Sequence, residues 1–313
     1  MSQQQALLGL IHQRATDALK SGALQSIETT ERVITDAGVP FVVRSVSSLR
    51  LKADQSPARP SQDPSSQQGR NPFLPYDPDL FVTDLGDTHV CLLNKFNVMP
   101  HHVLIVTRRY ESQDEILTQS DFQALWHGQT SIQGLCFYNG GAAAGASQPH
   151  KHLQIVPLPL SPSGPELPVE AIVNRPDMQG AGYGGVSTGL DLPFRHAFAR
   201  LDGVLDGALN GANASAHTRS ARGLYDLYRS LLSAAGIALI ATADGGWRTN
   251  EAYNLLVTQR WMLVVPRVRD SDHGISVNAL GFAGSLFVRD EHDLHTLETL
   301  GPMTLLRNVS HAL

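Results

Sequence analysis

The residues best suited to chemistry lie in one stretch, residues 139–157, which reads NGGAAAGASQPHKHLQIVP. Its second part, HKHLQ at residues 150–154, leads into an apolar run. If this part is a strand, the side chains of His150, His152 and Gln154 share one face, because successive side chains of a strand point to opposite sides. Two imidazoles and an amide would then converge on one spot.

Such a face permits two kinds of chemistry. Histidines at positions i and i+2 of a strand can both bind zinc, but Gln154 is a poor zinc ligand and no nearby Cys or Asp completes a set. A neutral imidazole is alternatively a competent nucleophile at neutral pH, because its ordinary pKa is about 6.5. Its attack on a phosphate anhydride would give a phosphoramidate and split one displacement into two. The sequence favours a nucleophile over a metal ligand.

The first part of the stretch is rich in glycine and precedes the histidines. Gly140, Gly141 and Gly145 permit a close backbone approach in which amides point at an anion. Ser147 adds a hydroxyl and Gln148 an amide. A glycine-rich run alone is equally typical of a flexible turn, but next to in-phase histidines it indicates an anion-binding loop.

The elements that must position these residues are short β-rich runs separated by turn signals. A helical segment near residues 120–130 interrupts them, and Ser120 and Gln123 have the spacing of a capping box. Consecutive strands with short connections favour an antiparallel sheet with helices packed on it, so the predicted fold class is α+β. The predicted strands cover residues 41–46, 89–96, 102–107, 135–139, 151–158, 253–258 and 261–265, and further helices cover 6–20 and the segment around 224–232.

Residues 159–195 are rich in Pro and Gly and mark a junction. We therefore expect an N-terminal region at 1–165, a junction at 166–194 and a C-terminal region at 195–313. The doublet His101-His102 resembles a metal pair, but adjacent strand residues point to opposite faces, which favours a structural or surface role. The tryptophans are expected to pack in the core or in hairpins.

The bulk properties limit the possible partners. The chain has 313 residues, a net charge of −5 and a pI near 6.2, so neither nucleic acid nor an anionic membrane should attract it as a whole. Phosphates would have to be bound by a few placed cations and backbone amides. Cys91 and Cys136 sit in apolar runs and are expected to be buried, reduced thiols. With no signal peptide or membrane span apparent, the expected location is the cytoplasm.

A family resemblance emerges from these motifs. HKHLQ resembles the HxHxQ signature of the transferase branch of the histidine-triad superfamily, and GASQPHKHLQ looks like the diadenosine tetraphosphate (Ap4A) phosphorylase, or ATP adenylyltransferase, family. HxHxQ alone would leave galactose-1-phosphate uridylyltransferases equally open. Four further stretches resemble the Ap4A phosphorylase family in order along the chain: NPFLP at 71–75, LLNKFNVMPHHVLIVTR at 92–108, YNLLVTQRWMLVVPR at 253–267 and NALGFAGSL at 278–286.

The resemblance implies a histidine-triad-like, mostly antiparallel sheet with flanking helices and a C-terminal part that folds back onto the site. It also implies the reaction Ap4A + phosphate ⇌ ADP + ATP, with adenosine 5′-phosphosulfate as a second AMP donor. The implied partners are therefore small nucleotides and phosphate. Mg²⁺ would be bound mainly through substrate phosphates. For the oligomeric state, a monomer is slightly favoured.

The resemblance also implies roles for individual residues. His152 would be the nucleophile, Gln154 would bond phosphate oxygens of the intermediate, and His150 would orient the imidazole. The family has Met and Lys where this chain has Ser285 and Arg289. The implied substrate-binding residues are Lys52, Asn94, Lys95, Asn139, Gly145, Ala146, Ser147, Gln148, Asn278, Ser285 and Arg289.

Two rival functions remain open at this point. One is another nucleotidyl transfer, such as uridylyl exchange with a hexose 1-phosphate. The other is a non-catalytic nucleotide-binding protein, which would bind adenine nucleotides and never form a covalent adduct.

Overall fold

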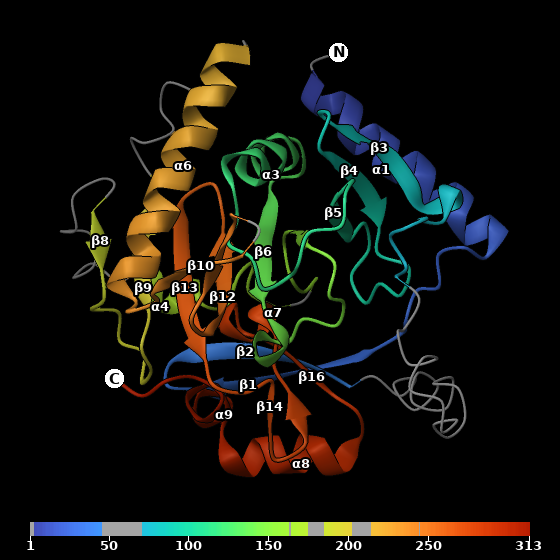
Figure 1. Cartoon of the computed structure of the whole chain (residues 1–313). Coiled ribbons are helices and arrows are strands. Elements are labelled where there is room, and N and C mark those ends of the chain that lie inside the picture. Colours follow the sequence, from blue (N-terminus) through green and yellow to red (C-terminus); the bar gives the residue numbers. More distant parts are fainter. Residues whose placement is uncertain (1–2, 46–70, 163, 175–184, 202–213, 244) are drawn as a thin grey trace, which may run out of the picture.

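The computed structural model describes residues 1–313 apart from 1–2, 46–70, 163, 175–184, 202–213 and 244. Its centre is a nine-stranded sheet in which every neighbouring pair is antiparallel, as predicted (Figure 1). The strands are, in order across the sheet, β3 (Phe81–Leu85), β4 (His89–Leu93), β5 (Val103–Thr107), β7 (His152–Pro157), β6 (Gly134–Gly140), β12 (Ala252–Val257), β13 (Trp261–Arg267), β9 (Ala197–Arg200) and β8 (Val186–Ser187).

Three helices cover one face of this sheet: α1 (Gln3–Ser21), α3 (Gln119–Ile132) and α6 (Ala214–Ala234). They lie together on the upper side in Figure 1. Their apolar stripes bury against strand residues such as Leu153 and Ile155 of β7, which point to this face by the period-two rule. Both cysteines, Cys91 and Cys136, are buried in this core as free thiols, as predicted.

The opposite face is covered by a second layer, at the bottom of Figure 1. It is built on a three-stranded sheet of β1 (Thr30–Asp36), β2 (Val39–Ser45) and β16 (Ser285–Val288), in which β16 runs parallel to β2. The C-terminal part of the chain therefore folds back onto its N-terminal part, as predicted. The helices of this layer are α4 (Glu170–Val173), α7 (Ala279–Phe282), α8 (Glu291–Leu300) and α9 (Pro302–Asn308).

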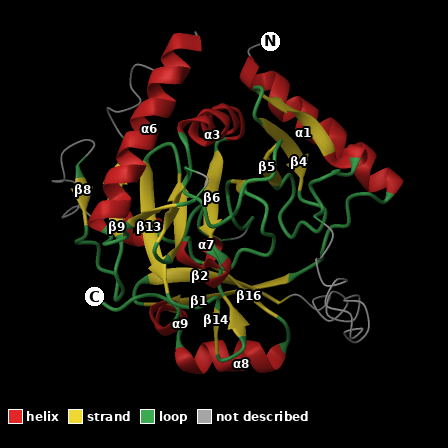
Figure 2. Ribbon diagram, viewed as in Figure 1, coloured by secondary structure: helices red, strands yellow, loops and turns green. Residues whose placement is uncertain are grey.

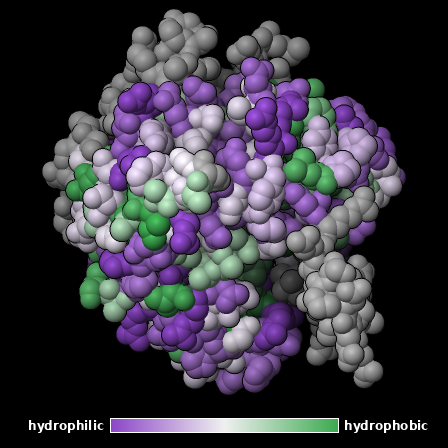
Figure 3. Space-filling view, viewed as in Figure 1, coloured by the Kyte–Doolittle hydropathy of each residue, from purple (hydrophilic) through white to green (hydrophobic). Residues whose placement is uncertain are grey.

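The remaining elements are short (Figure 2). They are the 3₁₀ turns η2 (Pro78–Leu80) and η3 (Ala142–Ala144) and the pairs β10 (Leu239–Ala241) with β11 (Trp247–Thr249) and β14 (Ser271–Asp272) with β15 (Ile275–Ser276). Trp126 and Trp261 are buried as predicted, whereas Trp247 is 49% exposed on the β10–β11 pair. The surface in Figure 3 is mostly hydrophilic, with hydrophobic residues in small separate groups. None of the described helices is both long and apolar enough to cross a membrane.

The start of α3 differs from the prediction. The capping box is formed by Thr118 and Asp121, two residues before the predicted pair. The Thr118 amide donates to the Asp121 carboxylate at 2.6 Å, and Asp121 also contacts His89 Nε2 at 2.8 Å. Asp121 is buried, so its carboxylate forms these bonds away from water, whereas Ser120 is only half-buried.

Candidate active site

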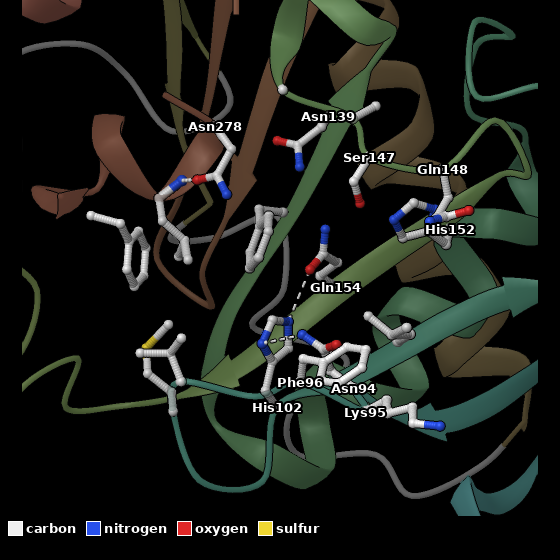
Figure 4. A pocket seen from close by; sticks show the side chains of 18 of the residues that line it. Asn94, Lys95, Phe96, His102, Asn139, Ser147, Gln148, His152, Gln154 and Asn278 are labelled. Atoms are coloured by element: carbon white, nitrogen blue, oxygen red, sulfur yellow. Dashed lines mark hydrogen bonds between the residues drawn. The ribbon is translucent and has the colours of Figure 1, made fainter. Parts of the chain in front are cut away.

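A cavity of about 1290 Å³ opens between the two layers and collects nearly all of the predicted site residues. One wall is the lower face of the large sheet, and the others are the segment around residues 71–80 and the C-terminal part from 270 to 293. Figure 4 shows side chains from these parts turned toward one space. The predicted residues that line it are Asn94, Lys95, Asn139, Gly145, Ala146, Ser147, Gln148, His152, Gln154, Asn278, Ser285 and Arg289.

His152, at the start of β7, presents an unprotonated nitrogen to this cavity. Its Nδ1 lies 2.9 Å from the main-chain oxygen of His150, so Nδ1 carries the proton and donates it. The lone pair is therefore on Nε2. Burial lowers the His152 pKa to about 4, which keeps the ring neutral at physiological pH. The ring of Phe73 lies 5.4 Å away, centre to centre, and contributes to this burial. The ring is thus neutral, oriented and accessible from the cavity.

His150 does not join His152 in the cavity, and the predicted convergence of two imidazoles is wrong. Its Nε2 contacts the main-chain oxygens of Thr107 at 2.8 Å and Arg109 at 3.1 Å, while its Nδ1 accepts from Asn71 Nδ2 at 3.0 Å. The reason is that β7 begins only at His152, whereas His150 forms an isolated antiparallel bridge with Ser112, so the regular alternation of β7 does not extend to residue 150. His150 orients the His152 ring through its carbonyl group rather than through its side chain.

Gln154 is held by a chain of hydrogen bonds that the sequence did not predict. Asn94 Nδ2 donates to Nδ1 of His102 at 3.0 Å, and Nε2 of His102 donates to Oε1 of Gln154 at 2.9 Å. Burial lowers the His102 pKa to about 4, so this ring is also neutral. Figure 4 shows the Gln154 nitrogen on the other side, toward Asn139 and Ser147. His102, for which a structural or surface role was expected, lines the cavity and holds Gln154 there.

Asn139 is the second-last residue of the neighbouring strand, β6, and is fixed by a buried network. Its Oδ1 accepts from Asn254 Nδ2 at 2.9 Å and from the amide of Ala279 at 3.0 Å, so the amide nitrogen is the end left for a ligand. Asn254 in turn accepts from the guanidinium of Arg267 at 2.5 Å. Arg267 is 2% exposed, and its burial lowers its pKa to about 9. This network links the N-terminal strands to the C-terminal part at the cavity wall.

The glycine-rich loop passes very close to the C-terminal part. Gly145 has a φ of +86°, and a Cβ atom there would lie 2.8 Å from the Val277 oxygen and 2.9 Å from the Asn278 Cβ. Only glycine meets both conditions. Asn278 begins α7, where its side chain accepts from the amide of Leu280 at 2.9 Å. The loop and α7 thus meet at the cavity, as the predicted roles of Gly145 and Asn278 require.

The predicted cationic and C-terminal positions have different surroundings. Lys95 lines the cavity with its ammonium 5.8 Å from the centre of the Phe96 ring. Arg289 is paired with Asp293 through two bonds of 2.7 and 3.0 Å, which raise the Arg289 pKa. Ser285 is buried and its hydroxyl accepts from Arg44 at 2.6 Å. Lys52 lies outside the described residues.

Lys151 occupies the opposite face of the sheet from the cavity and is completely buried. Its ammonium lies 2.6 Å from a Glu111 oxygen and 3.8 Å from oxygens of both Glu115 and Asp121. A buried charge requires such partners. This ion cluster therefore anchors the HKHLQ segment on the side away from the cavity. No local sequence pattern predicts the cluster.

The donor set of the cavity matches a phosphate chain better than a metal cage. Amides and a hydroxyl predominate around His152, and the described residues include no group of three or more His, Cys, Asp or Glu side chains placed to hold a metal ion. Amide donors and a neutral imidazole can bind and attack a phosphate anhydride, because each donor meets an anionic oxygen.

Comparison with protein families gives two matches that together span most of the chain. Residues 1–175 match the Ap4A phosphorylase N-terminal domain, and residues 190–312 match the ATP adenylyltransferase C-terminal domain. A curated relative from Saccharomyces cerevisiae, diadenosine 5′,5‴-P1,P4-tetraphosphate phosphorylase 2, is 29% identical, over 92% of this chain and 88% of that protein. Protein APA1 of the same yeast is 26% identical, over 91% and 87%.

Solved structures share the fold. The crystal structure of yeast Ap4A phosphorylase Apa2 superposes with a TM-score of 0.73 at 24% identity, covering 98% of this chain and 94% of that one. The same yeast protein in complex with AMP gives a TM-score of 0.71 at 25% identity, covering 100% and 97%. The α+β architecture of the two layers is therefore that of yeast Apa2.

Proposed function

The chain belongs to the Ap4A phosphorylase family of ATP adenylyltransferases, and from this premise we propose that its cavity converts Ap4A and phosphate reversibly into ADP and ATP. The family assignment rests on the domain matches along the chain, and the yeast relatives carry the corresponding names. The cavity, of about 1290 Å³, has room for an extended dinucleotide. Among the rival functions, uridylyl exchange loses support because the match runs through both halves of the chain.

The proposed reaction proceeds in two displacements at phosphorus. Nε2 of His152 attacks the α-phosphorus of Ap4A, a P–N bond forms, the bond from that phosphorus to the bridging oxygen breaks, and ATP leaves. The Nδ1–H of His152 continues to donate to the His150 oxygen, which stabilises the positive imidazolium of the adduct. An oxygen of phosphate then attacks the same phosphorus, the P–N bond breaks, and ADP leaves with the neutral ring restored.

The surroundings stabilise the charge that develops on the phosphorus oxygens. The Gln154 and Asn139 nitrogens are donors that hydrogen bonds hold in place, and Ser147 and Lys95 add a hydroxyl and a positive charge to the cavity. Donors held in place before the reaction need no reorganisation during it, and each is typically worth a few kcal/mol in the transition state. Gln154 can donate but cannot act as a base, so attack by water on the adduct receives little help.

The single observation that carries the proposal is the unprotonated Nε2 of His152 facing the cavity. To test it, the protein is incubated with Ap4A labelled at the α-phosphorus in the absence of phosphate. We expect label on His152 that is stable to base and labile to acid, and that phosphate releases as ADP. Turnover without any protein-bound label would contradict the covalent step.

A variant separates catalysis from binding. His152→Asn removes the nucleophile but retains a similar polar volume, so it should abolish turnover and leave nucleotide affinity nearly unchanged. Unchanged turnover would exclude the proposed role of His152. Binding without label or turnover in the wild type would instead favour the non-catalytic binding protein, and exchange with UDP-sugars would favour a uridylyltransferase.

We extend the proposal to conditions and accessory ligands. Mg²⁺ would enter with the substrate phosphates, which fits a cavity wall of amides rather than clustered carboxylates, and chelation should then lower turnover without unfolding the protein. Adenosine 5′-phosphosulfate would serve as a second AMP donor. The buried free thiols Cys91 and Cys136 fit a reducing cytoplasm. A monomer is proposed, to be checked by sedimentation.

A further inference from the structure

The ladder between β6 and β7 stops where the active site begins. The two strands pair from Gly134 opposite Pro157 to Phe137 opposite Gln154. Continued in the same register, the ladder would place Asn139 opposite His152. Both residues lie within their strands, and both line the cavity. Their main-chain groups need other partners, because buried N–H and C=O groups are costly without them.

The side chain of Gln113 bonds three of these groups, and the Asn139 oxygen also accepts from the Gly141 amide at 3.1 Å. Its Oε1 accepts from the amide of His152 at 2.8 Å. Its Nε2 donates to the Asn139 oxygen at 2.8 Å and to the His152 oxygen at 3.2 Å. One carboxamide thus bridges the two strands and holds both main-chain groups of His152. Gln113 is 2% exposed, so these bonds are shielded from water.

We propose that Gln113 is a positioning residue for the nucleophile, a carboxamide that takes the place of the missing ladder and sets where the His152 imidazole stands. The proposal rests on the function proposed above. Gln113 acts on the main chain of His152, and it belongs to none of the motifs that suggested the site.

Gln113 is itself held from several sides. Its amide donates to the Pro149 oxygen at 2.8 Å, and its carbonyl accepts from the Tyr138 hydroxyl at 2.7 Å. The neighbouring amide of Lys151 donates to the Glu111 oxygen at 2.8 Å, and the Lys151 ammonium reaches the Glu111 carboxylate at 2.6 Å. The Lys151 ammonium also donates to the Ile116 oxygen at 3.3 Å, so the segment 111–116 is held on both sides of Gln113.

The side chain must combine a donor and an acceptor at one end. The His152 amide needs an acceptor, whereas the two carbonyl groups need a donor. Glutamine provides both without charge. Methionine has a similar length and provides neither, and glutamate retains the acceptor but directs a carboxylate oxygen at the carbonyl groups. Gln113→Met therefore removes both the donor and the acceptor, whereas Gln113→Glu removes only the donor.

Gln129 offers a matched control. It is 1% exposed, and its Nε2 donates to the Gly134 oxygen at 2.8 Å near the other end of β6, away from the cavity. Gln129→Met and Gln113→Met each remove a buried carboxamide that bonds a main-chain oxygen of β6. A general effect on folding should appear in both variants, and an effect on the position of His152 only in Gln113→Met.

The experiment measures label transfer from α-labelled Ap4A to the protein in a single turnover without phosphate, together with nucleotide affinity. We expect Gln113→Met to slow transfer on the order of 100-fold, because displacements of about 1 Å at a reacting atom have effects of that size. Nucleotide affinity should change by less than about threefold, as for a loss that falls on the chemical step. Gln129→Met should transfer label at the wild-type rate per folded molecule.

A second measurement does not depend on activity, so it can also be made on variants that fold in low yield. ¹⁵N spectra of histidine-labelled protein report which ring nitrogen of His152 carries the proton. We expect the wild type and Gln129→Met to show Nδ1–H, and Gln113→Glu and Gln113→Met to lose this single tautomer. A wild-type rate of label transfer in Gln113→Met would overturn the proposal. An unchanged His152 spectrum in both Gln113→Met and Gln113→Glu would also overturn it. If the wild type takes up no label, the proposed function falls, and the spectra still decide on Gln113.

Discussion

At the residue scale, the hydrogen-bond chain through His102 decides which end of the Gln154 amide a phosphate would meet. Asn94 donates to Nδ1 of His102, so the ring must donate through Nε2 to the Gln154 oxygen. The Gln154 nitrogen, a donor, is then the end that faces the cavity (Figure 4). The reverse orientation would direct a lone pair at an anionic oxygen. A neutral His102 is thus needed as much as a neutral His152.

We therefore predict that His102→Ala lowers the rate of label transfer to the protein by about 10-fold or more, less than the roughly 100-fold effect of removing a fixed donor, because Gln154 remains but is no longer held. The control is His196→Ala, which removes another buried histidine whose ring forms two hydrogen bonds, here with the Leu190 amide and the Phe194 oxygen, away from the cavity. Equal rates in both variants would show that His102 has no part in orienting Gln154.

The sequence predicted some of these residues and not others for identifiable reasons. His152 and Gln154 were found because strand alternation and the HxHxQ motif agree on them. The two adjacent histidines do diverge, with His101 stacked on His12 at 4.1 Å and His102 turned to Gln154. Strand alternation is not the cause, because β5 begins only at Val103 and His101 has a φ of +60°. Gln113 had no local signal, because its partners are 26 and 39 residues away along the chain.

At the element scale, the turn between β6 and β7 is shaped by its contact with the C-terminal part. The φ of Gly145 and its short distance to Val277 are independent constraints, and they can be separated by experiment. Gly245 has the same φ of +86°, but a Cβ atom there would meet nothing within 4 Å. The pair of glycines thus distinguishes backbone strain from crowding.

Gly245→Ala should lower the free energy of unfolding by about 1 kcal/mol, the strain of a left-handed alanine. Gly145→Ala should cost about 1–3 kcal/mol more, because the neighbouring backbone must move to admit the methyl group. Nucleotide binding should weaken only in Gly145→Ala. Urea unfolding and a nucleotide titration measure both effects. Equal losses in the two variants would mean that the contact with Val277 does not constrain the turn.

The strands around the site were predictable from their composition, whereas long-range pairing was not. The runs at β4, β5, β6, β7, β12 and β13 were all located within a few residues. The parallel pairing of β16 with β2 joins Ser285 to Val42 across most of the chain, and no local pattern encodes it. The buried hydrogen bond from Arg44 to Ser285 depends on that pairing, so the local sequence could not predict it either.

At the scale of the whole molecule, the two neutral histidines of the cavity tie its stability to pH. Burial lowers the pKa values of His102 and His152 to about 4, against about 6.5 in the unfolded chain. Between these values the unfolded chain binds more protons than the folded one. The stabilisation is therefore complete above pH 6.5 and is lost as the pH falls toward 4.

Between pH 7 and pH 5 we expect each of these histidines to account for a loss of roughly 2 kcal/mol in the free energy of unfolding. Urea unfolding at the two pH values measures the loss, and the double variant His102→Gln, His152→Gln should show a clearly smaller one. His295→Gln, at an exposed position on α8, controls for the removal of a histidine as such. An equal pH dependence in the double variant would contradict the burial of neutral rings.

The pairing of β6 with β12 has a consequence for how such a chain could be divided during evolution or in the laboratory. Asn139 of one strand lies opposite Asn254 of the other, so the two matched family regions complete a single hydrogen-bonded sheet. Cleaving the chain between them would give two fragments, each with an exposed edge strand whose main-chain N–H and C=O groups lack partners. Such fragments should coaggregate or reassociate rather than behave as interchangeable modules, which opposes shuffling of either half into other genes.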